Sequence, residues 1–194
     1  MTTVWQFLQQ HYRALLALGV FVSISLTIAT IPSDSLIDAV GSNNAFALMF
    51  LLGLIGGLTT FTGVPYQVIL MSLAAGGLNP ILLGLSTAVG VMLGDSTMYL
   101  IGRGLKPSLS HRLLAALDKI KHYLAQHPRQ FTPALVLYGC LSPFSNDFVV
   151  GSLSIMGYPF WRTILPLAVG NIVYNIALAY LGVYAYDQLI GLFG

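Results

Sequence analysis

One acidic residue, Asp95, lies inside the most apolar stretch of this chain, between the runs Gly90–Gly94 and Ser96–Ile101. A carboxylate at bilayer depth costs at least ~2.5 kcal/mol on insertion scales, and such groups pair with a polar partner or face a water-filled cavity. Asp95 therefore indicates a binding site or a pathway inside a membrane.

The composition favours an integral membrane protein. Of the 194 residues, 56% are hydrophobic and 7% are charged, whereas soluble domains carry about 25% charged residues. The net charge of +2 is too small to indicate a nucleic-acid partner, and the single cysteine, Cys140, excludes an internal disulfide. We expect one membrane domain over residues 1–194.

Three apolar runs predict transmembrane helices, at residues 14–31, 81–102 and 163–184. A spanning helix needs about 20 apolar residues. For the run at 14–31 a cleaved signal peptide is the alternative, but its length and the lack of a clear Ala-x-Ala site favour a transmembrane helix.

Two further apolar stretches are interrupted near their centres and predict re-entrant hairpins. The first covers residues 45–78 and contains Pro65 in its break; the second covers residues 133–157 and contains Pro143. Each arm is too short to span a bilayer. A break at this depth is tolerated where protein or water satisfies the backbone, and each proline is expected to break the helix first and to shape a site second.

The segment 106–127 predicts an amphipathic helix on the membrane surface, packed against the protein or not. Six of the eight Lys and Arg residues lie between Arg103 and Arg129, which places this segment in the cytoplasm by the positive-inside rule. The N-terminus is then cytoplasmic and the two hairpins enter from opposite sides. The expected location is a bacterial inner (plasma) membrane.

A weak internal repeat agrees with the opposed hairpins. A shift of 80 residues gives eight identical pairs between the halves and also places Gln67 opposite Asp147 and Asp95 opposite Asn175. Such repeats are typical of transporters whose site lies near the midplane. The predicted fold is therefore an all-α integral membrane protein, an inverted repeat of a re-entrant helical hairpin plus a transmembrane helix, with a cytoplasmic amphipathic helix.

The block Gly94-Asp95-x-x-x-Tyr99-x-x-Gly102-Arg103 resembles the span motif of the DedA family, also called the VTT or SNARE-associated Golgi protein superfamily. The order of hairpins, spans and basic segment is similar as well, over roughly residues 45 to 185. The resemblance implies a lipid transporter, a flippase or scramblase for a polyprenyl phosphate or a phospholipid, with membrane lipids as partners. A small-solute or ion exporter on the same scaffold and a non-transporting assembly factor are the alternatives.

Two departures from the family pattern concern the cargo. Gln67 stands where many members carry an acid in the first hairpin, and Ser145, Asn146 and Asp147 stand where many carry two arginines in the second. The missing arginines weaken the inference of a phosphate-headed cargo.

The candidate transport or lipid-binding residues lie at the breaks and on the spans. They are Pro65, Gln67, Asp95, Tyr99, Arg103, Pro143, Asn146, Asp147, Asn171 and Asn175.

Each acidic candidate also has a structural alternative. Asp95 can pair with Tyr99 or Arg103 of its own helix, and Asn146 and Asp147 can cap a following helix over residues 148–156. If transport is coupled to protons, we expect Asp147 to exchange them and Asp95 to serve mainly in packing.

Enzyme activity is not expected. The four histidines lie outside the apolar spans, and the chain has no His-Glu-x-x-His, no Gly-x-Ser-x-Gly and no cysteine cluster. No cofactor or metal is therefore predicted. The pair Gly90-x-x-x-Gly94 favours close packing of helices within the chain over a dimer face, and a homodimer stays an open alternative.

Overall fold

The computed structural model describes residues 33–57, 66–105, 111–141 and 146–193, together with Ser23 and Thr27. All secondary structure in these ranges is α-helical, as predicted. The predicted span at 14–31 falls almost wholly outside the described residues, and so do Pro65 and Pro143 with most of each hairpin break. The helices are α2 (Ser33–Val40), α3 (Ser42–Gly56), α4 (Tyr66–Ala75), α5 (Pro80–Leu105), α6 (His111–Gln126), α7 (Pro128–Leu141), α8 (Asp147–Ile155) and α9 (Phe160–Phe193).

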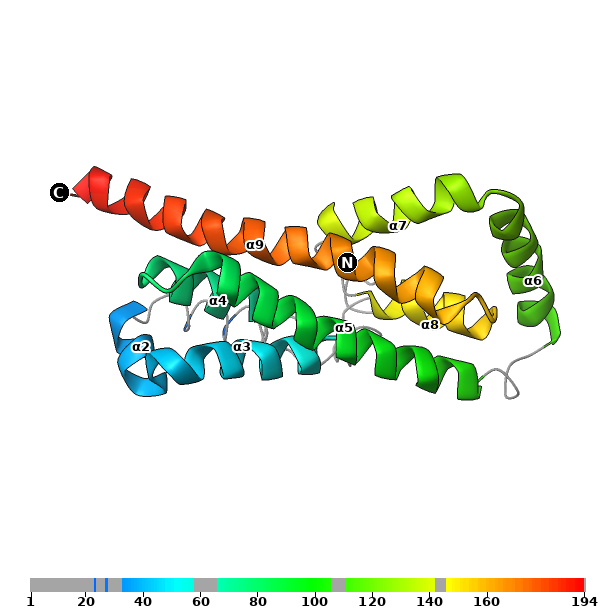
Figure 1. Ribbon diagram of the computed structural model, residues 1–194, viewed down its shortest axis with the longest axis horizontal. Coiled ribbons are helices and arrows are strands. Elements are labelled where there is room, and N and C mark those ends of the chain that lie inside the picture. The colour runs from blue at the N-terminus through cyan, green and yellow to red at the C-terminus, as the bar shows by residue number, and fades with distance from the viewer. Residues whose placement is uncertain are drawn as a thin grey trace, which may run out of the picture.

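Two long helices, α5 and α9, run side by side in opposite directions along the whole molecule (Figure 1). Their segments Pro80–Gly104 and Phe160–Ala185 are long and apolar enough to cross a membrane. The sequence predicted spans at 81–102 and 163–184, and the observed helices extend further at both ends. Pro166 lies inside α9 without ending it.

The short helices lie in two pairs at opposite ends of this frame (Figure 1): α3 and α4 near α2, and α7 and α8 near α6. The pairs divide between the long helices in the same way, since α3 packs on α5 and α7 packs on α9, whereas α4 packs on α9 and α8 packs on α5. The helix α7 begins at Pro128 and continues through Pro133, where the sequence placed the start of the second hairpin. Pro128 is well suited to a first helical position because its missing N–H has no helical partner there.

The turns that follow α4 and α8 have the same geometry. Gly77 and Gly157 have positive φ angles of 90° and 69°. In each turn the second residue donates a backbone bond back across the helix end, from Leu78 to Leu73 at 3.4 Å and from Tyr158 to Leu153 at 2.9 Å. This is a Schellman ending, which favours glycine at the left-handed position. The two turns are 80 residues apart, in the register of the sequence repeat.

The pair Gly90-x-x-x-Gly94 packs against α3 within the chain. A Cβ atom at Gly90 would collide with the Phe50 carbonyl oxygen, and one at Gly94 would lie 2.5 Å from the backbone carbon of Gly57. Between α7 and α9, a Cβ atom at Gly170 would likewise lie 2.5 Å from the Val136 carbonyl oxygen. These contacts account for the motif by internal packing, as the sequence favoured.

The apolar core is divided into two clusters, one near each end of α5 and α9. One cluster includes Leu83 of α5 and Ala179 of α9; the other includes Tyr99 of α5 and Leu167 of α9. Along both helices the polar residues Asp95, Asn171 and Asn175 lie between these clusters.

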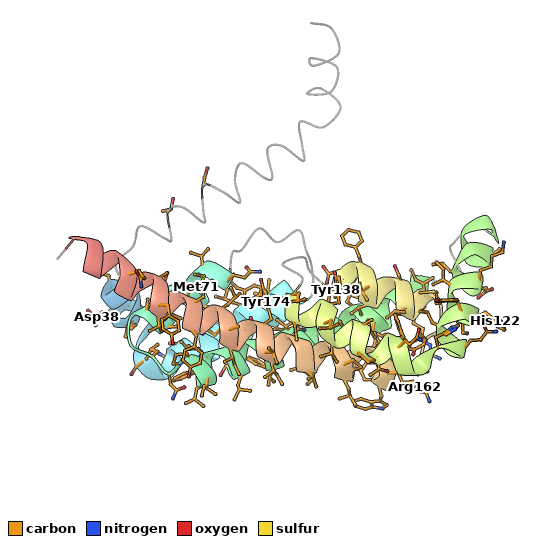
Figure 2. All side chains as sticks on the ribbon, turned by 90° about the horizontal axis from the view of Figure 1, so that it is seen from above. Asp38, Met71, His122, Tyr138, Arg162 and Tyr174 are labelled. Carbon is orange, nitrogen blue, oxygen red and sulfur yellow. The ribbon has the colours of Figure 1, made fainter. Side chains whose placement is uncertain are left out.

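The helix α6 carries Leu117 and Leu124 toward the second cluster and exposes Ile120 and Tyr123. Its apolar residues thus serve partly in packing. Figure 2 places Asp38 at one end of the molecule and His122 and Arg162 at the other, with Met71 and Tyr174 between them.

Candidate functional site

The side chain of Asp95 lies midway along α5 and is only 1% exposed. Its Oδ2 atom accepts hydrogen bonds from Asn146 Nδ2 at 2.8 Å and from Asn171 Nδ2 at 3.5 Å. The residue before α8 and the helix α9 therefore converge on one carboxylate. A buried carboxylate needs such donors, because leaving it without them costs far more than leaving a neutral polar group unpaired.

Asn146 does not cap α8. Its backbone is already helical, with φ −68° and ψ −12°, and its side chain makes no capping hydrogen bond. Capping residues usually have extended backbones that direct the side chain to the next free N–H groups. The amide of Asn146 instead crosses to Asp95, so the capping alternative is wrong for this residue.

Asp147 is the first residue of α8 and is buried. A carboxylate in this position is favoured by the free N–H groups and the dipole of the helix. Asp147 also lies near enough to Asp95 for its charge to act on that carboxylate.

Asn171 and Asn175 lie one turn apart on α9 and are 6% and 1% exposed. Asn175 Nδ2 donates to the Asn171 backbone carbonyl at 2.8 Å. Asn171 in turn donates to Asp95, so a continuous chain of hydrogen bonds runs from Asn175 through Asn171 to the carboxylate. We call the five buried residues of this region the Asp95 cluster: Asp95, Asn146, Asp147, Asn171 and Asn175.

Two acceptor atoms of the Asp95 cluster are not used. Asp95 Oδ1 and Asn175 Oδ1 are buried and have no hydrogen-bond partner among the described residues. Most buried polar atoms in proteins are hydrogen-bonded, and exceptions commonly mark a function or a bound species. The cluster therefore has spare capacity to accept a donor or a cation.

Tyr99 and Arg103 do not pair with Asp95, in contrast to the structural alternative. The Tyr99 hydroxyl donates to the Tyr158 carbonyl oxygen, and the Tyr99 carbonyl accepts from the Ser154 hydroxyl at 2.7 Å. Tyr99 thus joins α5 to α8 and to the turn after it. The side chain of Arg103 is exposed near the end of α5.

Gln67 lies in the first turn of α4 and is half-buried. Its neighbour Tyr66, which the sequence did not single out, packs against Gly56 and interacts electrostatically with Asp95 and Tyr174. An aromatic residue next to a predicted break was the only signal in the sequence for this contribution. Pro65 and Pro143 lie outside the described residues.

An all-helical chain with two membrane-length apolar helices, which bury a carboxylate held by two amides between them, has the character of an integral membrane protein with an internal polar site. The family model of the VTT domain matches residues 64–184, which is more than half of the chain, so the chain belongs to the VTT domain family of membrane proteins. The resemblance found in the block from Gly94 to Arg103 is thereby confirmed. Comparisons with curated proteins and with solved structures return no significant match.

Proposed function

We propose that this protein moves a lipid across the bilayer, as a flippase or scramblase. The observation that carries the proposal is the Asp95 cluster, a buried polar centre halfway along two membrane-length helices, with an apolar cluster on each side of it. Polar residues at bilayer depth are expensive and mark substrate or ion pathways. A site near the midplane is where transporters built from repeats bind their substrates.

The same function would be served by an inverted repeat of two re-entrant hairpins. The support is an exchange of contacts at a spacing of 80 residues: Gly102 of α5 packs on Gly151 of α8, and Gly182 of α9 packs on Met71 of α4. Each pair converts into the other when both residues move to the opposite half. Two halves related in this way can rock against each other and open the central cluster to either side in turn.

The cluster also limits how a cargo is bound. Its described side chains are carboxylates and amides, and no lysine or arginine lies among them. A phosphate would therefore meet hydrogen-bond donors from amides and helix N-termini rather than a paired cation. This favours a lipid whose headgroup is not recognised through its negative charge alone.

Reconstituted vesicles that carry a fluorescent phospholipid test the proposal. Wild-type protein should expose the inner-leaflet lipid to an impermeant quencher. Asn146→Ala should slow this exposure at least about tenfold, because a hydrogen bond to a charged group contributes ~1.5–3 kcal/mol and each ~1.4 kcal/mol is a factor of ten. The matched control is Asn44→Ala, at an exposed asparagine of α3.

Vesicles with wild-type protein that exchange lipid no faster than protein-free vesicles would refute lipid transport. If those vesicles instead pass a small solute or ion, the exporter alternative takes its place. Equal slowing by Asn146→Ala and Asn44→Ala would remove the Asp95 cluster from the lipid path.

A further inference from the structure

We propose that the Asp95 cluster binds a small monovalent cation of the sodium class, held by Asp95 Oδ1 and Asn175 Oδ1. The inference deepens the proposed function, on which it depends for the role of the ion as a partner in lipid movement. Binding of the ion itself is a separate property that can be measured without transport.

The charge inventory of the cluster calls for one positive charge. It contains two carboxylates, and the described Lys and Arg side chains lie elsewhere, as with exposed Arg103 and Arg162. Asp147 lies at the first position of α8, where the helix N-terminus offsets part of its charge. Asp95 lies in the middle of α5, and its donors are the neutral amides of Asn146 and Asn171. One buried negative charge is thus left without a cation among the described residues.

The hydrogen bonds also fix where a cation would bind. The Asn175 Nδ2 atom donates to a backbone carbonyl, and a flipped amide would instead bring two acceptor oxygens together. Its Oδ1 atom is therefore the free end of the amide. The Asp95 Oδ2 atom is occupied by two amide donors, which leaves Oδ1 as the free end of the carboxylate.

The chemistry of these atoms selects a hard cation, because both are oxygens and hard cations prefer oxygen ligands. Calcium takes six to eight oxygen ligands and magnesium usually keeps several waters, whereas Asp95 and Asn175 are each 1% exposed. A single remaining negative charge is balanced by a monovalent ion. The same burial disfavours the ammonium group of a lipid, which would have to reach these atoms with its headgroup attached.

The test is thermal unfolding of the full-length chain in detergent, in NaCl against choline chloride at equal ionic strength. A ligand at 100 times its dissociation constant stabilises a protein enough to raise the melting temperature by roughly 5 °C in a chain of this size. We expect that rise in NaCl for the wild type and for the control Asp118→Asn, an exposed carboxylate of α6. We expect its loss in Asp95→Asn and in Asn175→Ala. If one of these two variants fails to fold, the other variant and direct binding of radioactive sodium to wild type carry the test.

Equal melting temperatures in NaCl and choline chloride would overturn the inference and leave the two oxygens to buried water or to a proton. A sodium effect that survives in both Asp95→Asn and Asn175→Ala would overturn it as well. So would a rise seen with phosphatidylethanolamine but not phosphatidylglycerol in sodium-free buffer, because the lipid ammonium would then be the cation.

Lipid exchange is measured in parallel in vesicles with and without sodium. Lipid exchange without any sodium binding refutes this inference alone. Sodium binding without lipid exchange refutes the proposed function alone.

Discussion

Replacement of Asp95 and Asn146 by leucine, singly and together, separates a hydrogen-bonded pair from a helix cap. In the pair, Asn146 donates to Asp95 at 2.8 Å across 51 residues of sequence, and both side chains are buried. Leucine is close in size to both residues, so each single variant mainly leaves the partner buried without its bond. Each should lower the free energy of unfolding by ~1.5–3 kcal/mol.

The double variant removes both polar groups, so it should be more stable than the sum of the two single effects predicts. Its coupling energy should lie near 1.5–3 kcal/mol, since close pairs in one network couple in this range. Reversible unfolding in mixed detergent micelles measures the four species of this cycle. The control cycle joins Asn146→Leu to Asp118→Leu on the surface of α6 and should be additive.

Additivity within about 0.5 kcal/mol in the Asp95 cycle would refute the pairing. It would mean that Asn146 stabilises the start of α8 by itself, as a cap does. A coupling energy of equal size in the control cycle would show that the effect is not specific to the Asp95 cluster.

Two further predictions concern packing and topology. Gly90→Ala should destabilise the protein by roughly 1–3 kcal/mol, because the added carbon meets the backbone of α3. The matched variant Gly104→Ala, in the same helix with open space around it, should be neutral or stabilising; equal unfolding midpoints would contradict the close contact. In a Cys140→Ser background, Asp38→Cys and His122→Cys should react with an impermeant thiol reagent from opposite sides of a sealed membrane, since they lie at opposite ends of the molecule; labelling of both from one side would rule out the proposed orientation of α5 and α9.

The long apolar runs and the family could be predicted from the sequence because both are written in local patterns. The run of apolar residues around Asp95 specifies a long helix wherever the chain is placed, and the Gly-Asp-Tyr-Gly-Arg block lies within ten consecutive residues. The polar character of Asn171 and Asn175 was visible as well, from their positions on the last span.

The partners of Asp95 could not be predicted, since they come from residues 51 and 76 positions away. Helical spacing favoured Tyr99 and Arg103, one and two turns along the same helix. In the fold, Tyr99 is engaged by the turn after α8 and Arg103 reaches the surface. Asn146 looked like a cap because it precedes a short helix, and only its helical backbone angles exclude that role.

The contact between Gly182 of α9 and Met71 of α4 has a consequence for biogenesis. At about 5–20 residues per second, the ribosome needs on the order of 5–20 s to make the chain between these two positions. During that interval α4 has already entered the membrane, and the face that will receive α9 has no permanent neighbour. Nascent chains of this protein should therefore depend on an insertase or membrane chaperone that shelters α4 until translation is nearly complete, and release from it should coincide with the arrival of α9.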